Sequence, residues 1–499
     1  MRLTALFRRR VPVLGGAVAV VLALPAHLAV SAVNDLPELG DPAATVLTPE
    51  EETQLGRRFM RAARQKLAFV TDPELDDHIR RLGNEIARVT AAEDPSYRFY
   101  LIRNKELNAF AVPGGHIAVH TGLVLAAKTE DELASVLAHE IAHLRQHHMA
   151  RMVAQSKSLT IPAIAAIVAG VLLGGQAGAA AIVATNAALA DSQLRYTRDF
   201  EREADRIGMQ YLAEAGFKPA AMPRFFEQLQ HWSRVQEGNA PEFLRTHPIT
   251  SDRIAEAQAR ADALPPPQAP RSDLDFRLVQ AKIRSLYNEP AQDLLKALDE
   301  GVVGERPEVI SYGKAVLLSR LGRRDAARQE WAELFKADPE RRAYQIGRVQ
   351  SEIAANDYRR ALEYLREAEN RFPDDRVLAL YHADTLLKTG QPQEARTRLR
   401  TLLRRDPGNP VLHQMLARAE GDAGNMLGMH RNLAEYHYLN GNTSEALRQL
   451  RLARQYAGDN YYESAGLDAR VTEVEREARE TVKEEKSRPP ESSDPKKRR

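Results

Sequence analysis

The chain has 499 residues, which is enough for about two or three domains that each bury a hydrophobic core. Its 70 Lys and Arg residues nearly balance its 68 Asp and Glu residues. The net charge of +2 argues against a nucleic-acid binder, because such proteins concentrate positive charge on one face. The chain has no cysteine, so disulfides, thiolate metal sites and cysteine catalysis are excluded, and any metal ion must be held by His and carboxylate side chains.

Residues 1–32 have the composition of an export signal. Arg2 and Arg8–Arg10 give a positively charged start, Val11–Val30 is apolar, and the small residues of Val30–Ala32 offer a cleavage site. An uncleaved membrane anchor is the alternative interpretation. In both cases the remainder of the chain is expected to lie outside the cytoplasm.

Residues 45–263 are expected to form a mixed domain of helices and a small sheet. Thr48–Glu51 has a capping Thr, a Pro and a Glu at the spacing of a capping box, which predicts a helix start, and a second helix is predicted for Asp72–Val89. Tyr97–Val119 contains an alternating segment and short apolar runs that are typical of strands. Pro113–Gly115 marks a turn between two of these strands.

Two further helices are predicted on either side of an apolar segment. Thr129–Glu132 forms a second capping box and starts a helix that is expected to run to about Met152, and helix resumes from about Asp191 to Ala215. The intervening Leu159–Ala190 is too short for two membrane crossings, which need about 40 apolar residues. A single crossing would separate the motifs that flank it. We therefore expect a helical lid or a shallow membrane-dipping hairpin, with a buried helix as the alternative.

Residues 264–271 have the proline-rich composition of a stiff linker, and a periodic pattern follows in residues 272–465. Three sets of residues recur every 34 positions: Pro339, Pro373 and Pro407; Gly322, Asn356, Gly390 and Gly424; Ala327, Ala361 and Ala395. The period, the small turn residue and the terminal proline resemble tetratricopeptide repeats, which stack helix pairs into a superhelix.

The periodic pattern changes before the chain ends. Gly441 and Ala446 keep the Gly-to-Ala spacing but lie out of period, which indicates that the register slips by one helix. Residues 471–499 are strongly charged and are expected to form a frayed helix followed by a disordered tail.

The strongest functional signal is the pentapeptide His139–His143, which reads His-Glu-Ile-Ala-His. Residues four apart on a helix share one face, so both imidazoles can reach a single metal ion. Glu140 can lean over the same ion, take a proton from an activated water and pass it to the leaving amine. The pattern is therefore typical of a metallopeptidase.

A catalytic zinc ion usually has three protein ligands and one open position. The candidates for the third ligand are His147, His148, Glu201 and Glu203. On a straight helix His147 would lie about 12 Å from His139, too far to share an ion, and is expected at the surface or behind the ligands. Glu201 and Asp205 share a helix face, and Glu203 points roughly the opposite way, where a salt-bridging role is expected. Glu201 is therefore the predicted ligand.

Three motifs in this order resemble the HtpX and CAAX-prenyl-protease family of gluzincins: Asn108–Gly115, His139–His143 and Glu201–Asp205. Together with the export signal and the C-terminal repeats, they are similar to periplasmic members of that family over roughly residues 45–460. The implied fold is mostly α: a gluzincin metalloprotease domain (α+β, with a small sheet) followed by an α–α superhelix of tetratricopeptide repeats.

The resemblance also implies roles for single residues. One zinc ion (Zn2+) per chain would be held by His139, His143 and Glu201, with Glu140 as the general base. The family carries an acidic residue at the position of Asp205, often assigned as a proton donor. The spacing alone favours a different role for Asp205, that of orienting a ligand histidine.

His247, in Thr246-His247-Pro248, matches a further element of the family. A loop histidine near the ion can donate a hydrogen bond to the oxyanion of the tetrahedral intermediate. It can instead fill the fourth coordination position and hold the enzyme latent, and an exposed histidine without a role is the third interpretation. The strand Asn108–Val112 offers a sheet edge that can bind an extended substrate, with an ordinary strand as the alternative.

We therefore expect a periplasmic zinc metalloendopeptidase that, as the resemblance implies, acts in the assembly and quality control of outer-membrane proteins. Misfolded or stalled outer-membrane proteins would be its substrates, and its repeats would bind substrate or the assembly machinery. Peripheral membrane contact through residues 159–190 is expected, and a nucleic-acid partner is not. The alternative is a repeat-based chaperone or adaptor with a structural or latent zinc site, which the intact Glu140 disfavours. Prenyl-protein processing is disfavoured by the export signal.

Overall fold

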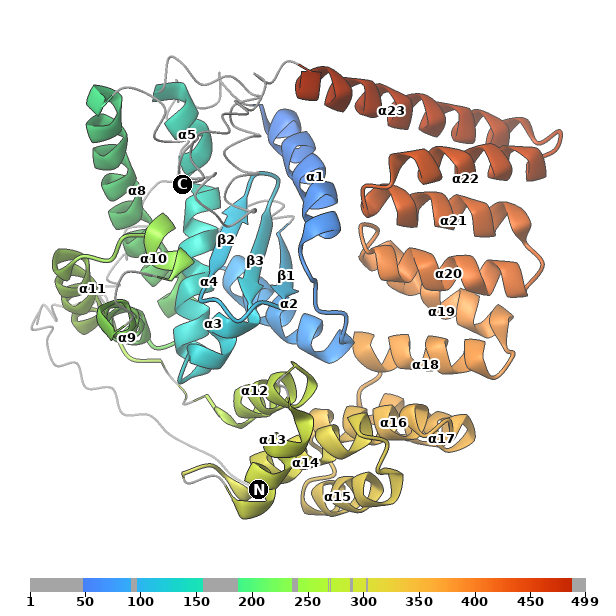
Figure 1. Ribbon diagram of the computed structural model, residues 1–499, viewed down its shortest axis with the longest axis horizontal. Helices are drawn as coiled ribbons and strands as arrows, with labels where there is room; N and C mark the ends of the chain where they lie inside the picture. Colours follow the sequence, from blue (N-terminus) through green and yellow to red (C-terminus); the bar gives the residue numbers. More distant parts are fainter. Residues whose placement is uncertain are drawn as a thin grey trace, which may run out of the picture. The chain divides into compact units, whose positions relative to one another are not determined.

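The computed structural model describes residues 48–90, 97–155, 187–235, 241–267, 269, 271–287, 290–301 and 304–486. Helices predominate among these residues, and their strands form one small sheet (Figure 1), so the predicted fold class is confirmed. The expectations for the export signal, for most of residues 159–190 and for residues 487–499 concern segments outside these ranges. None of the described helices combines the length and the apolar character that crossing a membrane requires.

The first two helices begin where their capping residues predict. Helix α1 (Pro49–Lys66) follows Thr48, whose Oγ1 accepts a hydrogen bond from the Glu51 N–H over 3.2 Å. In return, the Glu51 carboxylate accepts from the Thr48 N–H over 2.8 Å, which completes the capping box. Helix α2 (Pro73–Ala87) follows Asp72, whose carboxylate accepts from two N–H groups of the first turn.

The strands β1 (Arg98–Ile102), β2 (Ala109–Val112) and β3 (His116–His120) lie in the order β1-β3-β2. β1 pairs with β3 in parallel and β2 pairs with β3 antiparallel. The predicted turn between β2 and β3 contains Gly114 and Gly115, both with φ of 80°, a conformation that favours glycine. No described strand pairs with the outer side of β2, so β2 is an edge strand.

The helix predicted to run from Thr129 to about Met152 is interrupted, so this prediction is wrong. Helix α4 (Glu130–Arg145) ends two residues after His143, the last residue of the pentapeptide, and α5 (His148–Gln155) starts in a new direction. His147 at the break has φ of 50°. Histidine enters this left-handed region more readily than most residues, and no Gly or Pro marks the break in the sequence. The change of direction turns His148 back towards the end of α4.

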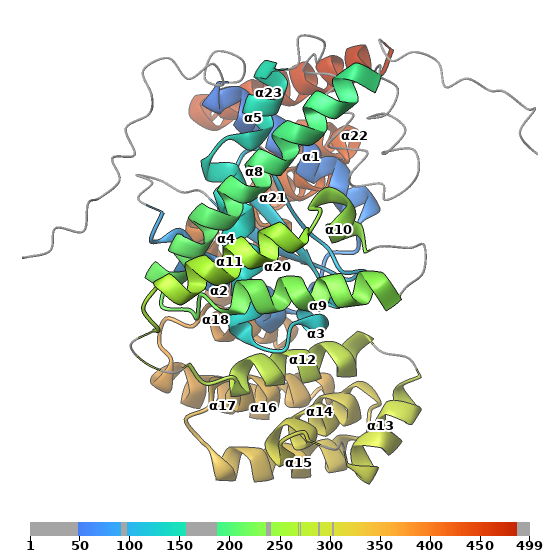
Figure 2. The same ribbon diagram turned by 90° about the vertical axis from the view of Figure 1, so that its left-hand side faces the viewer.

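Helix α8 (Ala187–Glu214) packs along α4 and supplies the second half of the site (Figure 2), and it confirms the helix predicted at about Asp191–Ala215. Gly208 permits the close approach, because a Cβ atom there would lie 3.0 Å from the backbone of Ala138 and His139. Leu137 and Ile141 of α4 are fully buried in the core beside it. The other helices of this half are α3 (Thr121–Ala126), α9 (Ala221–Val235), α10 (Glu242–Thr246) and α11 (Ser251–Ala263).

Helix α12 (Leu274–Tyr287) follows the proline-rich segment and takes part in two hydrophobic cores. Phe276 and Ile283 pack in the core that contains α4, whereas Leu278 packs with the repeats. The Gln280 side chain donates hydrogen bonds of 2.8 Å to the carbonyls of Val124 and Ala127 at the end of α3. The helix therefore belongs to both halves of the chain.

The repeat region consists of helix pairs, as predicted. The helices are α13 (Ala291–Glu300), α14 (Pro307–Arg320), α15 (Arg324–Ala337), α16 (Arg342–Ala354), α17 (Tyr358–Arg371), α18 (Arg376–Lys388), α19 (Pro392–Arg405), α20 (Pro410–Asp422), α21 (Met426–Leu439) and α22 (Thr443–Tyr456). The turn residues Gly322, Asn356, Gly390 and Gly424 all have positive φ. Gly441 does so one helix after Gly424, which confirms the slip in register.

The fraying predicted from Val471 onwards is wrong for the described part of the chain. Helix α23 extends without interruption from Tyr461 to Lys486. Val474 is fully buried against α21 and α22. Glu477 accepts a hydrogen bond of 2.7 Å from the Tyr438 hydroxyl and one of 2.9 Å from Arg61 of α1. The charged residues thus pair with the rest of the protein, which sequence composition does not reveal.

Candidate metal centre

The structure brings together the three predicted metal ligands. His139 and His143 lie on one face of α4, with 3.0 Å between their Nε2 atoms. Glu201 of α8 places one carboxylate oxygen 3.4 Å from His139 Nε2 and the other 3.4 Å from His143 Nε2. The two helices that Gly208 holds in close contact therefore present two imidazoles and a carboxylate to one point.

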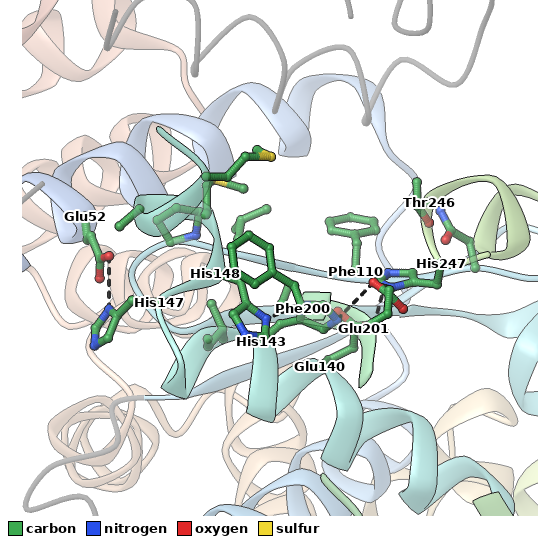
Figure 3. Close-up of a pocket in the computed structure, with 18 residues that line it drawn as sticks. Glu52, Phe110, Glu140, His143, His147, His148, Phe200, Glu201, Thr246 and His247 are labelled. Atoms are coloured by element: carbon green, nitrogen blue, oxygen red, sulfur yellow. Dashed lines mark hydrogen bonds and ion pairs between the residues drawn. The ribbon is translucent and has the colours of Figure 1, made fainter. Parts of the chain in front are cut away.

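His247 joins this cluster from the C-terminal end of α10. Its Nδ1 atom lies 2.9 Å from a Glu201 oxygen (Figure 3) and 3.3 Å from His139 Nε2, and its ring stacks on Phe243. One ligand atom from each of His139, His143, Glu201 and His247 lies within 4.8 Å of the others. His247 Nδ1 therefore occupies the place of a fourth ligand.

The donor set fits a divalent zinc ion. Tetrahedral zinc with bonds of about 2.1 Å separates its ligand atoms by roughly 3.4 Å, which is close to the spacing of these four side chains. Imidazole and carboxylate are the zinc ligands open to a chain without cysteine. In addition, the buried Glu140 Oε1 has no hydrogen-bond partner among the described residues and faces His247 Nε2 at 3.5 Å. A buried carboxylate of this kind is expected to meet a cation or a water molecule.

Behind the cluster, Asp205 and Arg253 hold His139 in place. An Asp205 oxygen lies 3.0 Å from His139 Nδ1, so Asp205 is positioned to orient that imidazole. Arg253 of α11 donates hydrogen bonds of 2.7 and 2.8 Å to the two Asp205 oxygens. A third guanidinium nitrogen lies 2.9 Å from Glu201. The sequence analysis did not identify Arg253.

The carboxylates of the cluster are held in their ionised form, which attracts a cation, while the metal-free protein keeps a proton on His139. Although burial opposes it, the carboxylates of Asp205 and Glu201 raise the pKa of His139 to about 10. Burial would raise the pKa of Glu201, but His247 and the two other histidines lower it well below its ordinary value. Asp205 likewise has a lowered pKa, because His139 and Arg253 outweigh its burial. Both carboxylates are therefore ionised, and ionised carboxylates are the form that binds metal.

The remaining candidates lie outside the ligand cluster. His147 is half-exposed and lies 3.2 Å from a Glu52 oxygen, consistent with the expected surface position. Glu203 forms an ion pair of 2.9 Å with Arg151, as a salt-bridging residue should. Glu203 also lies 3.2 Å from His148 Nε2, and this contact was not foreseen.

A cavity of about 240 Å³ opens beside the cluster. One of its walls is β2 with the following turn, and another is α5 with Phe200 of α8 (Figure 3). Phe110, Val112, Met149 and Phe200 make it largely apolar, whereas Glu140, His143, Glu201 and His247 form its polar side. The sheet edge, the apolar pocket and the ligand cluster therefore adjoin one another.

Comparisons with known proteins agree with this arrangement. The model of peptidase family M48 matches residues 73–261, and two tetratricopeptide repeat models match residues 312–376 and 352–419. The chain is 32% identical over 450 residues to the Beta-barrel assembly-enhancing protease of Escherichia coli, covering 88% of this chain and 91% of that protein. It is 31% identical over 449 residues to the Yersinia pestis protein of that name, with coverage of 88% and 92%.

A second group of similar proteins matches a shorter stretch of the chain. The chain is 32% identical over 198 residues to the Mitochondrial metalloendopeptidase OMA1 of Schizosaccharomyces pombe, covering 40% of this chain and 56% of that protein.

Proposed function

The chain belongs to peptidase family M48 and is related over most of its length to the beta-barrel assembly-enhancing proteases, and from this premise we propose that it is a periplasmic zinc endopeptidase for outer-membrane proteins. Metallopeptidase activity follows from the family. We further propose that the metal is zinc, that the protein is located in the periplasm, and that the residues of the cluster have the roles that follow.

The convergence of His139, His143 and Glu201 beside Glu140 is the observation that carries the proposal. These three side chains would hold zinc, which when bound supplies a Lewis acid that polarises the scissile carbonyl and makes water more acidic. Glu140 lines the cavity next to them and would accept a proton from the attacking water and return it to the leaving amine. Asp205, directed at His139 Nδ1, would orient that ligand rather than deliver a proton to substrate.

The edge strand β2 is suited to binding an unfolded substrate in an extended conformation. Its outer side can pair with a polypeptide through backbone hydrogen bonds, which do not depend on side-chain identity. The apolar wall formed by Phe110, Val112 and Phe200 would accept a large hydrophobic side chain beside the scissile bond. Misfolded or stalled outer-membrane proteins, rich in strand-forming apolar residues, match both features.

The position of His247 favours a closed resting state. Its Nδ1 lies at the place of a fourth ligand, where it would compete with water and substrate. An oxyanion role would need His247 to swing away from Glu201. We therefore propose that His247 holds the enzyme latent until α10 moves.

The repeats and the segment 159–190 would provide the contacts of this protein in the cell. Repeat superhelices are binding surfaces, so the repeats would bind the outer-membrane assembly machinery or its substrates. Residues 159–190, next to the site in sequence, would contact a membrane peripherally. The alternative function is that of a chaperone or adaptor with a structural or latent zinc site. The position of His247 among the ligand atoms favours this alternative. The buried Glu140 disfavours it, because a structural zinc site needs no general base.

Glu140→Gln tests the catalytic proposal, because Gln keeps the shape of Glu and cannot act as a base. We expect wild-type zinc content by metal analysis and a loss of cleavage of a denatured β-barrel protein on the order of 10²–10⁴-fold. Glu227→Gln, on the exposed side of α9, is the matched control. Wild-type cleavage by Glu140→Gln would refute the assignment, and lost cleavage with full cellular function would favour the chaperone.

A further inference from the structure

His143 has a hydrogen-bond partner that the proposed function does not use. His148 Nδ1 lies 2.9 Å from His143 Nδ1, and the two rings meet edge to face beside the cavity (Figure 3). His148 is buried, and its ring stacks on Phe200 with 4.5 Å between ring centroids. The contact forms where the chain turns at the left-handed residue His147, between α4 and α5.

The contact continues to a carboxylate. His148 Nε2 lies 3.2 Å from a Glu203 oxygen, and Arg151 donates a hydrogen bond of 2.9 Å to the same oxygen. The Arg151 guanidinium also lies over the Phe200 ring, 4.9 Å from its centroid. His143 therefore contacts His148, and His148 in turn contacts Glu203.

Only one arrangement of protons satisfies all of these contacts when His143 binds a metal ion. His143 Nε2 faces the other ligands, so Nε2 must be unprotonated and Nδ1 must carry the proton. That proton is donated to His148 Nδ1, which must then be unprotonated. His148 consequently carries its own proton on Nε2 and donates it to Glu203.

The other ligand histidine also has a carboxylate behind it, but without an intervening histidine. His139 Nδ1 faces Asp205 directly, and Arg253 holds Asp205. Asp205 and Glu203 both come from α8, two residues apart. One helix thus supplies a carboxylate behind each imidazole, directly for His139 and through His148 for His143.

We propose that His148 and Glu203 are positioning residues for the metal centre: they fix His143 in the tautomer that presents Nε2 and so raise the affinity for zinc. The proposal rests on the zinc ligands given under the proposed function. Partners behind a ligand histidine orient its ring and increase its basicity, and their loss typically costs 10–100-fold in metal affinity.

Zinc affinity, measured by competition with a chromophoric chelator, tests the proposal. His148→Phe keeps the ring and its stack on Phe200 but removes both nitrogens, and we expect a 10–100-fold loss of affinity. Glu203→Ala should cause a smaller loss. The double variant should match His148→Phe alone to within about twofold, because both residues act through one chain of hydrogen bonds. His231→Phe, an exposed histidine of α9, is the matched control.

Two outcomes would overturn the proposal: wild-type zinc affinity in His148→Phe, or losses that add in the double variant. Unfolding of the metal-free variants shows whether a loss of affinity is only a loss of structure. A second measurement needs no variant, because ¹⁵N spectra of histidine in the zinc-loaded protein report tautomers. They should show the His148 proton on Nε2, and a proton on Nδ1 would contradict the proposal.

The result is separable from the catalytic test. Zinc affinity does not depend on cleavage, so a catalytically normal Glu140→Gln would refute the proposed function without affecting the role of His148. Conversely, wild-type zinc affinity in His148→Phe would leave Glu140 as the general base.

Discussion

Arg253 donates two hydrogen bonds, of 2.7 and 2.8 Å, to Asp205, and both side chains are almost completely buried. The same guanidinium reaches Glu201 at 2.9 Å, so it contacts both a predicted metal ligand and the carboxylate behind His139. Such a bidentate contact requires the planar guanidinium group, and an ammonium group does not reproduce it.

Arg253→Leu is therefore expected to lower the free energy of unfolding by about 3–5 kcal/mol, because it leaves Asp205 and Glu201 buried without their cation. Chemical denaturation measures the change. Arg260→Leu, in the same helix but half-exposed, should change stability by less than about 0.5 kcal/mol. Equal effects of the two variants would show that the buried contact has no special importance.

His247→Ala distinguishes the two roles considered for this histidine. Because His247 Nδ1 lies among the ligand atoms, we expect faster cleavage of an unfolded substrate, by about tenfold if the open state is populated about one-tenth of the time. A residue that stabilises the oxyanion would give the opposite sign, a loss of about 10²–10³-fold. Initial rates at substrate concentrations well below KM, and at equal zinc content, decide between them.

Buried histidines should make the peptidase half sensitive to acid. Burial, with help from Arg98 and Arg64, lowers the pKa of His116 to about 3. The folded protein thus keeps His116 neutral, while the unfolded chain binds a proton below about pH 6.5. Stability attributable to His116 is complete above that pH and falls by about 1.4 kcal/mol per unit as the pH drops towards 3.

The corresponding experiment compares the pH dependence of unfolding in the wild type and in His116→Gln between pH 4.5 and 8. The variant should lose the contribution of one proton from the slope below pH 6.5. Exposed His231→Gln should keep the wild-type slope. An unchanged slope in His116→Gln would mean that His116 becomes protonated in the folded protein.

Lys282 forms a buried junction between the two halves of the chain. Its Nζ atom lies 2.5 Å from Glu74 and 3.1 Å from Asp72 of the α2 region, and 3.0 Å from Gln350 of α16. Lys282→Met should cost about 3–5 kcal/mol because Glu74 keeps a buried charge without its partner. Lys282→Met with Glu74→Gln should recover part of the loss in a double-mutant cycle, whereas Lys296→Met at the exposed surface of α13 should have little effect.

The left-handed backbone at His147 gives a final prediction. Glycine adopts φ of 50° without penalty, so His147→Gly should retain most of the stability, whereas the branched Val should cost about 1–2 kcal/mol. His147→Val should also lower zinc affinity, since the break delivers His148 to His143. Thermal unfolding and chelator competition measure the two effects, and equal behaviour of Gly and Val would exclude a role for the backbone conformation.

Spacing rules predicted those parts of the site that lie on single helices. His139, His143, Glu201 and Asp205 were found because residues four apart share a helix face. The 34-residue period located the turns of the repeats for a similar reason, since each landmark is a local requirement of the backbone.

The missed residues depend on tertiary packing. Arg253 lies on the same face of α11 as the buried Ala257 and Ala261, and an arginine in such an apolar stripe was the one available signal. Nothing in the sequence marks the helix break at His147, because histidine is not a strong helix breaker. The contact from His148 to His143 could therefore not be predicted, and the order of α23 depends on pairing with the distant α1.

Helix α12 restricts how proteins of this architecture can exchange parts. A recombination point within residues 264–271 would remove Phe276 and Ile283 from the peptidase and open a hydrophobic hole beneath α3. A crossover after Tyr287 would leave that interior filled. Chimeras that join a foreign repeat array to this peptidase should therefore retain the α12 of this chain.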